Sequence, residues 1–326
     1  LLKLYLDKMK EFREKHIFYS EHIGFLFWGL LIFLIIYFGA FGSLDSHPWY
    51  YNETSPNIFC FFLITTLGIS HGAYDHIKGK KFLKILEIKN ILIFYFLYIS
   101  LTFLIIFLWI YINIFMLITF LIVASFHFGK EDCASFLVKK THLTSLLYFM
   151  KGLLIILAPL LFHITDTIEI FKSLYLTDTK LINIVIFFSD NYIFLTLVIL
   201  SLICNFLIFN NYIFGAGAFI ESLIILLINF LFSPLVAFTI YFCFIHSIRH
   251  IISLIVEYEK EDFYFSKGIK KFCIRAWPLT LVTAVLFIVS VYFLTNYYVL
   301  DSAILKVIFI GLASLTFPHI LLEYLL

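Results

Sequence analysis

The sequence predicts an all-α fold, a polytopic transmembrane helical bundle of about ten spans with both termini in the cytoplasm. Apolar residues make up 63% of the 326-residue chain and charged residues only 13%, whereas a soluble domain has about 45–50% apolar and about 25% charged residues. The mean hydropathy of +1.03 requires apolar surface along most of the length, which only a bilayer tolerates. Basic residues are concentrated in alternate loops, which sets the orientation.

Ten segments have the roughly 20 mostly apolar residues that a membrane helix needs. The boundary between the third and fourth rests on a turn predicted near Asn113, and the apolar stretch 181–188 is not counted as a span. The predicted segments cover residues 23–44, 56–76, 90–110, 111–129, 143–165, 191–209, 213–230, 233–256, 276–300 and 302–324.

The orientation follows from the distribution of Lys and Arg, which accumulate in cytoplasmic loops. The N-terminal arm and the loops after the second, fourth and eighth segments carry three to five basic residues each, whereas the loop 45–55 has none and 166–190 has two. We therefore expect two parts: an amphipathic cytoplasmic arm, 1–22, and a single transmembrane helical domain, 23–326, which would carry any catalytic site. The arm has no apolar core of a signal peptide, and the five scattered cysteines predict neither disulfides nor a thiolate metal site.

In this topology, six histidines of the even-numbered segments lie in the cytoplasmic half of their helices. Ionisable side chains within a span usually face the bundle interior, so we expect them to converge on one layer. They are His71 and His76 in GISHGAYDHIKG, His127 in ASFHFGKED, His246 and His250 in FIHSIRH, and His319 in FPHILLEYL.

Four of these histidines, His71, His127, His246 and His250, are the predicted metal ligands. Imidazole is a common ligand for Fe, Zn and Cu, and it binds as the neutral form, which suits a low-dielectric site. Because His246 and His250 are four residues apart, a helix places both on one face. The alternative for each single histidine is a structural hydrogen bond between helices.

Five further residues are candidates for supporting roles. On a regular helix His76 points about 140° away from His71, so we interpret it as a supporting or interfacial residue. His319, directly after the helix-kinking Pro318, is a candidate fifth ligand or substrate-orienting residue. Asp75, Glu131 and Asp132 are candidates to accept the second N–H of a ligating imidazole, although Glu131 and Asp132 fit solvated charges at the membrane face equally well. We expect a buried partner for the mid-span Glu221, and for Arg249 either an acidic partner or the cytoplasmic surface.

The ordered motifs HGAYDH, FHFGKED, HSIRH and PH resemble those of the membrane-integral Brp/Blh family of β-carotene 15,15′-dioxygenases. The motifs run from His71 to His319, most of the chain. The resemblance implies a non-haem Fe(II) enzyme that uses O2 to cleave the central 15,15′ double bond of β-carotene into two molecules of all-trans-retinal. The resemblance also implies that His71, His127, His246 and His250 correspond to the family's iron ligands. Four imidazole ligands leave two open positions in an octahedral site.

Under this interpretation the partners are β-carotene, O2 and the lipid bilayer, with a microbial rhodopsin as downstream user of retinal and no nucleic acid. The expected location is the bacterial inner (cytoplasmic) membrane, as a multi-pass protein. A carotenoid or lipid hydroxylase or desaturase with a di-iron site is the alternative enzyme, but its H-x-x-H-H clusters are absent, as is the H-E-x-x-H of a zinc protease. A transporter with a histidine proton relay would more often place broken helices and acids near the midplane. A bis-histidine b-type cytochrome stays open as an alternative.

Overall fold

The computed structural model describes residues 23, 26, 28–39, 56–134, 143–211, 215–258 and 265–325, and these contain helices and no strand, which confirms the all-α prediction. The predicted arm, 1–22, lies outside the described residues. After the apolar helix Trp28–Gly39, the elements in chain order are α2 (Pro56–Leu63), a π-helical segment η1 (Ile64–Gly68), a 3₁₀ segment η2 (Ile69–Tyr74), α3 (Asp75–Ile85), α4 (Ile91–Tyr111), α5 (Asn113–Ala134), α6 (Thr144–Phe162), α7 (Ile164–Ser173), α8 (Thr179–Asp190), α9 (Ile193–Asn211), α10 (Gly215–Leu231), α11 (Pro234–Ile240), a second π-helical segment η3 (Tyr241–Ser247), α12 (Ile248–Tyr258), α13 (Phe265–Leu294) and α14 (Leu300–Leu325).

Seven helical segments of the described chain are long and apolar enough to cross a membrane, and the bent pair α8–α9, with 65° between its halves, makes an eighth. Two shorter apolar helices, Trp28–Gly39 and Phe219–Leu231, coincide with the first and seventh predicted segments. Each of the ten predicted segments thus overlaps an apolar helix, and the multi-pass architecture agrees with the sequence. The count of ten crossings and the cytoplasmic termini stay predictions.

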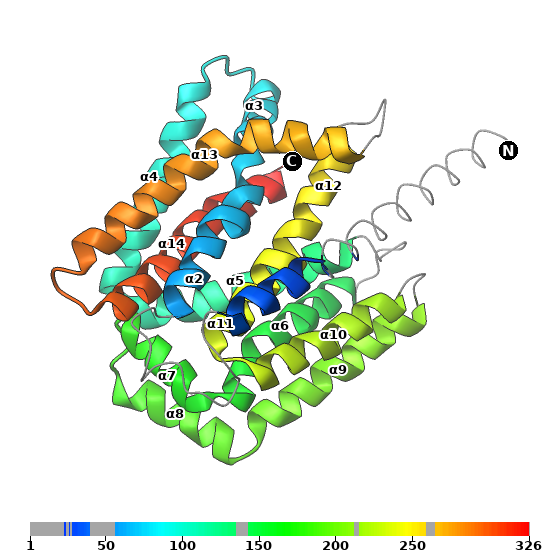
Figure 1. Ribbon diagram of the computed structural model, residues 1–326, viewed down its shortest axis with the longest axis vertical. Coiled ribbons are helices and arrows are strands. Elements are labelled where there is room, and N and C mark those ends of the chain that lie inside the picture. The colour runs from blue at the N-terminus through cyan, green and yellow to red at the C-terminus, as the bar shows by residue number, and fades with distance from the viewer. Residues whose placement is uncertain are drawn as a thin grey trace, which may run out of the picture.

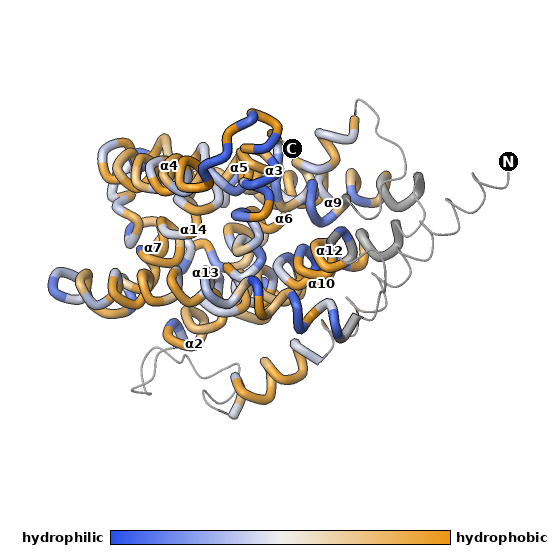
Figure 2. Tube along the Cα trace, turned by 90° about the horizontal axis from the view of Figure 1, so that it is seen from above, coloured by the Kyte–Doolittle hydropathy of each residue, from blue (hydrophilic) through white to orange (hydrophobic). Residues whose placement is uncertain are grey.

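The span α11–η3–α12 forms the centre of the bundle. Within Pro234–Ile255, 83% of the apolar window is buried, against 11% for the spans of α4 and α13. In Figure 1 this central span runs between α2 on one side and α6 and α10 on the other. The outer helices α4 and α13 expose large apolar side chains such as Phe103 and Phe293, and in Figure 2 hydrophobic residues dominate the trace, with hydrophilic residues gathered around α3. Such an apolar outer surface is suited to lipid.

Three stretches predicted as loops are helical. The basic loop after the second span begins with α3, because Lys78, Gly79 and Leu83 recur on one buried face of it. The loop 166–190 contains most of α7 and all of α8, each too short to span the membrane alone. Helix α13 begins at Phe265, eleven residues before the predicted start. In all three stretches, charged residues interrupt the apolar run without interrupting the helical period.

Two glycines allow α5 and α6 to approach closely. A Cβ at Gly129 would lie 1.7 Å from the Tyr148 carbonyl oxygen, and a Cβ at Gly152 would lie 1.8 Å from the Ser125 carbonyl oxygen. Small residues permit such backbone contact between membrane helices. His127 is two residues from Gly129, so this contact fixes the stretch of α5 that carries it.

We predict that Gly152→Ala destabilises the protein by about 1–3 kcal/mol or more, because the new methyl group meets backbone that moves only if the helices separate. The helix propensity gained from alanine, about 1 kcal/mol, is too small to offset this. Thermal unfolding of the detergent-purified protein measures the effect. Gly39→Ala is the matched control, because nothing lies within 4 Å of its added Cβ. Equal stability of the two variants would contradict the tight contact.

Candidate metal centre

Five histidine rings from five elements meet in one buried cluster. His71 comes from η2, His127 from α5, His246 from η3, His250 from α12 and His319 from α14, and none is more than 8% exposed. The ring centroids of His71 lie 5.4 Å from His246, 5.3 Å from His250 and 5.5 Å from His319. The His127 ring lies 5.6 Å from His246 and 5.4 Å from His319, and the rings of His250 and His319 are 5.7 Å apart. The convergence expected from topology is therefore present, and it includes His319.

The His71 ring is oriented by a carbonyl oxygen at a break in helical geometry. Its Nδ1 lies 2.7 Å from the Gly68 carbonyl oxygen, which also accepts a hydrogen bond of 2.8 Å from Ser247 Oγ. Gly68 stands where π geometry changes to 3₁₀ geometry, and a Cβ there would lie 2.7 Å from the ring of Phe242. When the hydrogen is on Nδ1, the Nε2 atom of His71 carries a lone pair that can bind a metal ion.

Carboxylates contact the Nδ1 atoms of two other rings. His319 Nδ1 lies 2.8 Å from Asp75 Oδ1, and Asp75 Oδ2 accepts a 2.8 Å hydrogen bond from Tyr98. His250 Nδ1 lies 3.2 Å from Glu131 Oε2. These contacts assign the hydrogen to Nδ1 of both rings and the lone pair to Nε2, the arrangement in which a carboxylate orients a metal-binding imidazole.

His246 faces a third carboxylate, Asp132, which belongs to a buried ionic network. Their nearest atoms, Nδ1 and Oδ1, are 3.6 Å apart. Asp132 Oδ2 accepts a 2.7 Å hydrogen bond from Tyr241, and Arg249 donates to the Asp132 carbonyl oxygen at 2.9 Å. The acidic-partner alternative for Arg249 is therefore the one observed.

Glu221 has the buried partners that its position required. Its carboxylate forms an ion pair with Arg249 and lies 3.8 Å from Lys151 Nζ. Lys151 is 0% exposed and donates to Ser222 Oγ at 2.8 Å. Paired charges are the form in which ionisable groups are tolerated in a membrane interior.

The cluster has the donors and the charge that suit a divalent cation. The buried Nε2 atoms of His250 and His319 have no hydrogen-bond partner. Burying such an acceptor destabilises the fold by about 1–3 kcal/mol per group, unless a new partner takes the place of the water that it loses. Five carboxylates and three basic groups surround the neutral rings, a formal charge of −2 when all are ionised. These groups are Asp75, Glu131, Asp132, Glu221 and Glu323, with Lys78, Lys151 and Arg249. The residues therefore fit a metal ion bound through imidazole nitrogens.

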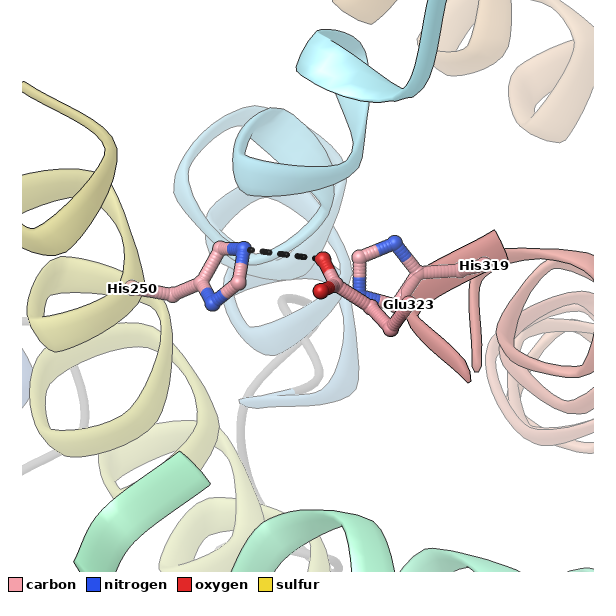
Figure 3. Close-up of side chains that lie close together, drawn as sticks. All are labelled: His250, His319 and Glu323. Atoms are coloured by element: carbon pink, nitrogen blue, oxygen red, sulfur yellow. Dashed lines mark ion pairs between the residues drawn. The ribbon is translucent and has the colours of Figure 1, made fainter. Parts of the chain in front are cut away.

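Glu323 is a candidate donor that the sequence interpretation missed. One ligand atom from each of His250, His319 and Glu323 lies within 4.8 Å of the others, and Figure 3 shows the Glu323 carboxylate between the two rings. This triad shares only His250 with the four predicted ligands. The signal was present in FPHILLEYL, since Glu323 follows His319 by four residues and thus shares its helix face.

The remaining histidines are not part of the described cluster. His76 is half-buried, and its Nδ1 lies 2.7 Å from the Ala73 carbonyl oxygen. His163 lies 3.8 Å from Asp166 at the junction of α6 and α7. His16, His22, His47 and His142 fall outside the described residues. Whether His76 supports the site stays a prediction.

Comparison with known proteins gives one result. The family model described as Beta-carotene 15,15'-dioxygenase matches residues 62–326, which include all five clustered histidines and Glu323. No curated protein and no solved structure matches the chain.

We predict that Asp75→Asn lowers the affinity of the cluster for a divalent metal about 10–100-fold, the usual effect of losing a carboxylate behind a ligating imidazole. Competition titration with a metal-sensitive dye, under anaerobic conditions, measures the affinity. Asp166→Asn is the matched control, because it changes a histidine–aspartate contact outside the cluster. Unchanged affinity in Asp75→Asn would show that His319 and its anchor contribute nothing to metal binding.

Proposed function

This chain belongs to the β-carotene 15,15′-dioxygenase family, and from that premise we propose that it cleaves β-carotene with a non-haem Fe(II) held by His71, His127, His246 and His250. The observation that carries the proposal is the single buried cluster of five imidazoles. In it, acceptors hold the Nδ1 atoms of His71, His250 and His319, and the Nε2 atoms of His250 and His319 have no hydrogen-bond partner. His319 contacts three rings of the cluster, and we propose it as a fifth donor.

The reaction breaks the central C=C bond and adds one oxygen atom of O2 to each of its carbons, which gives two all-trans-retinal molecules. Bound Fe(II) supplies the redox chemistry that lets O2 react with an alkene. The protein's own groups have two roles. Asp75 and Glu131 orient two of the imidazole rings through their Nδ1 atoms. The burial of the cluster excludes water from it. The use of retinal by a microbial rhodopsin is proposed on the resemblance alone.

Three aromatic rings, Phe128, Phe238 and Phe242, form what we call the aromatic wall, and they support a binding place for the polyene chain of β-carotene beside the histidine cluster. The Phe128 ring centroid lies 4.7 Å from that of His246, and Phe242 lies 5.8 Å from His71 and 5.9 Å from His246. Phe238 stacks on Phe242 at 5.4 Å. Aromatic faces pack well against a flat apolar chain, so we propose that β-carotene lies against these rings in an apolar tunnel that opens laterally to lipid.

The proposed location is the inner (cytoplasmic) membrane of a bacterium, with the bilayer delivering the substrate. The outward apolar faces of α4 and α13 support contact with lipid. Membrane fractionation with a reporter fused after Lys89 tests both location and orientation, since a cytoplasmic signal is expected there.

The central experiment combines metal analysis and product formation. Anaerobically purified wild-type protein should contain iron and should produce retinal from β-carotene and O2. His246→Ala should lose both, because a ligand is removed, whereas the control His163→Ala should retain both. Full iron content in His246→Ala, or activity that follows zinc rather than iron, would refute the proposed ligand set or the proposed metal.

A second prediction tests the aromatic wall. Phe242→Leu keeps apolar volume but removes the ring, and we expect cleavage to slow about 10-fold, on the order of the 1.4 kcal/mol available from an aromatic contact, with iron content unchanged. Loss of register should also yield aldehydes cut at other double bonds, which chromatography separates from retinal. Phe103→Ala, on the exposed face of α4, is the control. Wild-type rate and product pattern in Phe242→Leu would remove this ring from the substrate site.

A further inference from the structure

Glu323 is an acidic residue in the membrane bundle whose position is unfavourable without a charged partner. It lies in the last turn of α14, which ends at Leu325, where the helix dipole disfavours a carboxylate. Lys78 of α3 forms an ion pair with it. On its other side, Glu323 Oε1 lies 3.9 Å from His250 Nε2.

Three electron-pair donors face one another at this point. The Nδ1 atoms of His250 and His319 contact Glu131 and Asp75, so their Nε2 atoms carry lone pairs, and neither Nε2 has a hydrogen-bond partner. With the Glu323 oxygen they lie within 4.8 Å of one another, and Figure 3 shows the carboxylate between the two rings. Such donors repel one another unless a cation lies among them. Imidazole and carboxylate together suit first-row divalent transition metals.

Glu323 is the most exposed member of this group of donors. Its side chain is 18% exposed, whereas none of the five clustered histidines is more than 8% exposed. An ion arriving from solvent at this end of the bundle therefore meets the Glu323 carboxylate before it meets the inner imidazoles. Negative charge at the mouth of a site raises the rate at which cations reach it.

We propose that Glu323, His250 and His319 form a capture site for a divalent transition-metal ion. The ion then moves from Glu323 to the ligand set proposed above, in which His71, His127 and His246 join His250. The proposal rests on the metal function proposed for the inner cluster. Lys78 neutralises Glu323 while no ion is bound, and the ion replaces Lys78 as its partner on capture. Glu323 thus acts on the rate of metal uptake.

The test follows metal uptake with Co(II) alone as the probe. Protein stripped with a chelator in detergent is mixed with Co(II), and its visible absorption is recorded against time, with final metal content by elemental analysis. Glu323→Gln should slow uptake about 10-fold or more and reach nearly the wild-type final content. Glu87→Gln, the same charge change at an exposed residue after α3, should leave the rate unchanged.

A second variant separates capture from a purely structural ion pair. Lys78→Met removes the competing cation, so capture predicts uptake at the wild-type rate or faster. Equal slowing in Lys78→Met and Glu323→Gln would show that only the pair matters and would overturn the proposal, as would a normal rate in Glu323→Gln. A normal uptake rate in Glu323→Gln would leave the proposed metal centre intact. Wild-type protein that takes up no Co(II) would overturn both the capture site and the metal centre.

Discussion

The carbonyl oxygen of Gly68 accepts hydrogen bonds from His71 and from Ser247, and the relative position of the two central segments depends on this shared acceptor. Both segments depart from α-helical geometry here, one through η1 and η2 and the other through η3. Irregular backbone is tolerated at membrane depth only inside the protein, and all residues of η3 are buried. The glycine permits the close approach, since a Cβ would meet Phe242. The break in geometry thus places His71 and His246 in one layer.

Much of this arrangement could be predicted from the sequence because it depends on hydropathy and on topology. The spans follow from apolar length, and alternating basic loops put His71, His127, His246 and His319 in corresponding halves of their helices. Burial then brings such residues together, since the bundle interior is the least costly place for them. The separation of about 140° expected between His71 and His76 holds only for a regular α-helix, whereas Ile69–Tyr74 is 3₁₀. His76 nevertheless lies outside the cluster.

Contacts between distant residues could not be derived in this way. The Tyr98–Asp75–His319 chain joins three elements, and no periodicity specifies which carboxylate meets which ring. Glu323 was overlooked for a different reason: it lies near the end of an apolar run, where a charge is usually taken as a solvated terminus. Its four-residue spacing from His319 carries the same information as that between His246 and His250. The difference is that only histidines were considered as donors.

The cluster has two chemically different sides, and this separation is what an oxidative site for a hydrocarbon requires. The rings of Phe128 and Phe242 contact His246 and His71, while Glu323 and Lys78 lie beside His250. A metal ion must exchange with water, yet an apolar polyene binds best where water is excluded. Aromatic rings beside His71 and His246, and the more exposed carboxylate of Glu323 beside His250, would let the proposed polyene and the proposed metal ion reach different rings of the cluster. β-Carotene is about as long as the hydrocarbon core is thick, roughly 30 Å. If the cluster lies in the cytoplasmic half, as the basic loops predict, the centre of the molecule reaches it only when the molecule tilts or shifts along the aromatic wall.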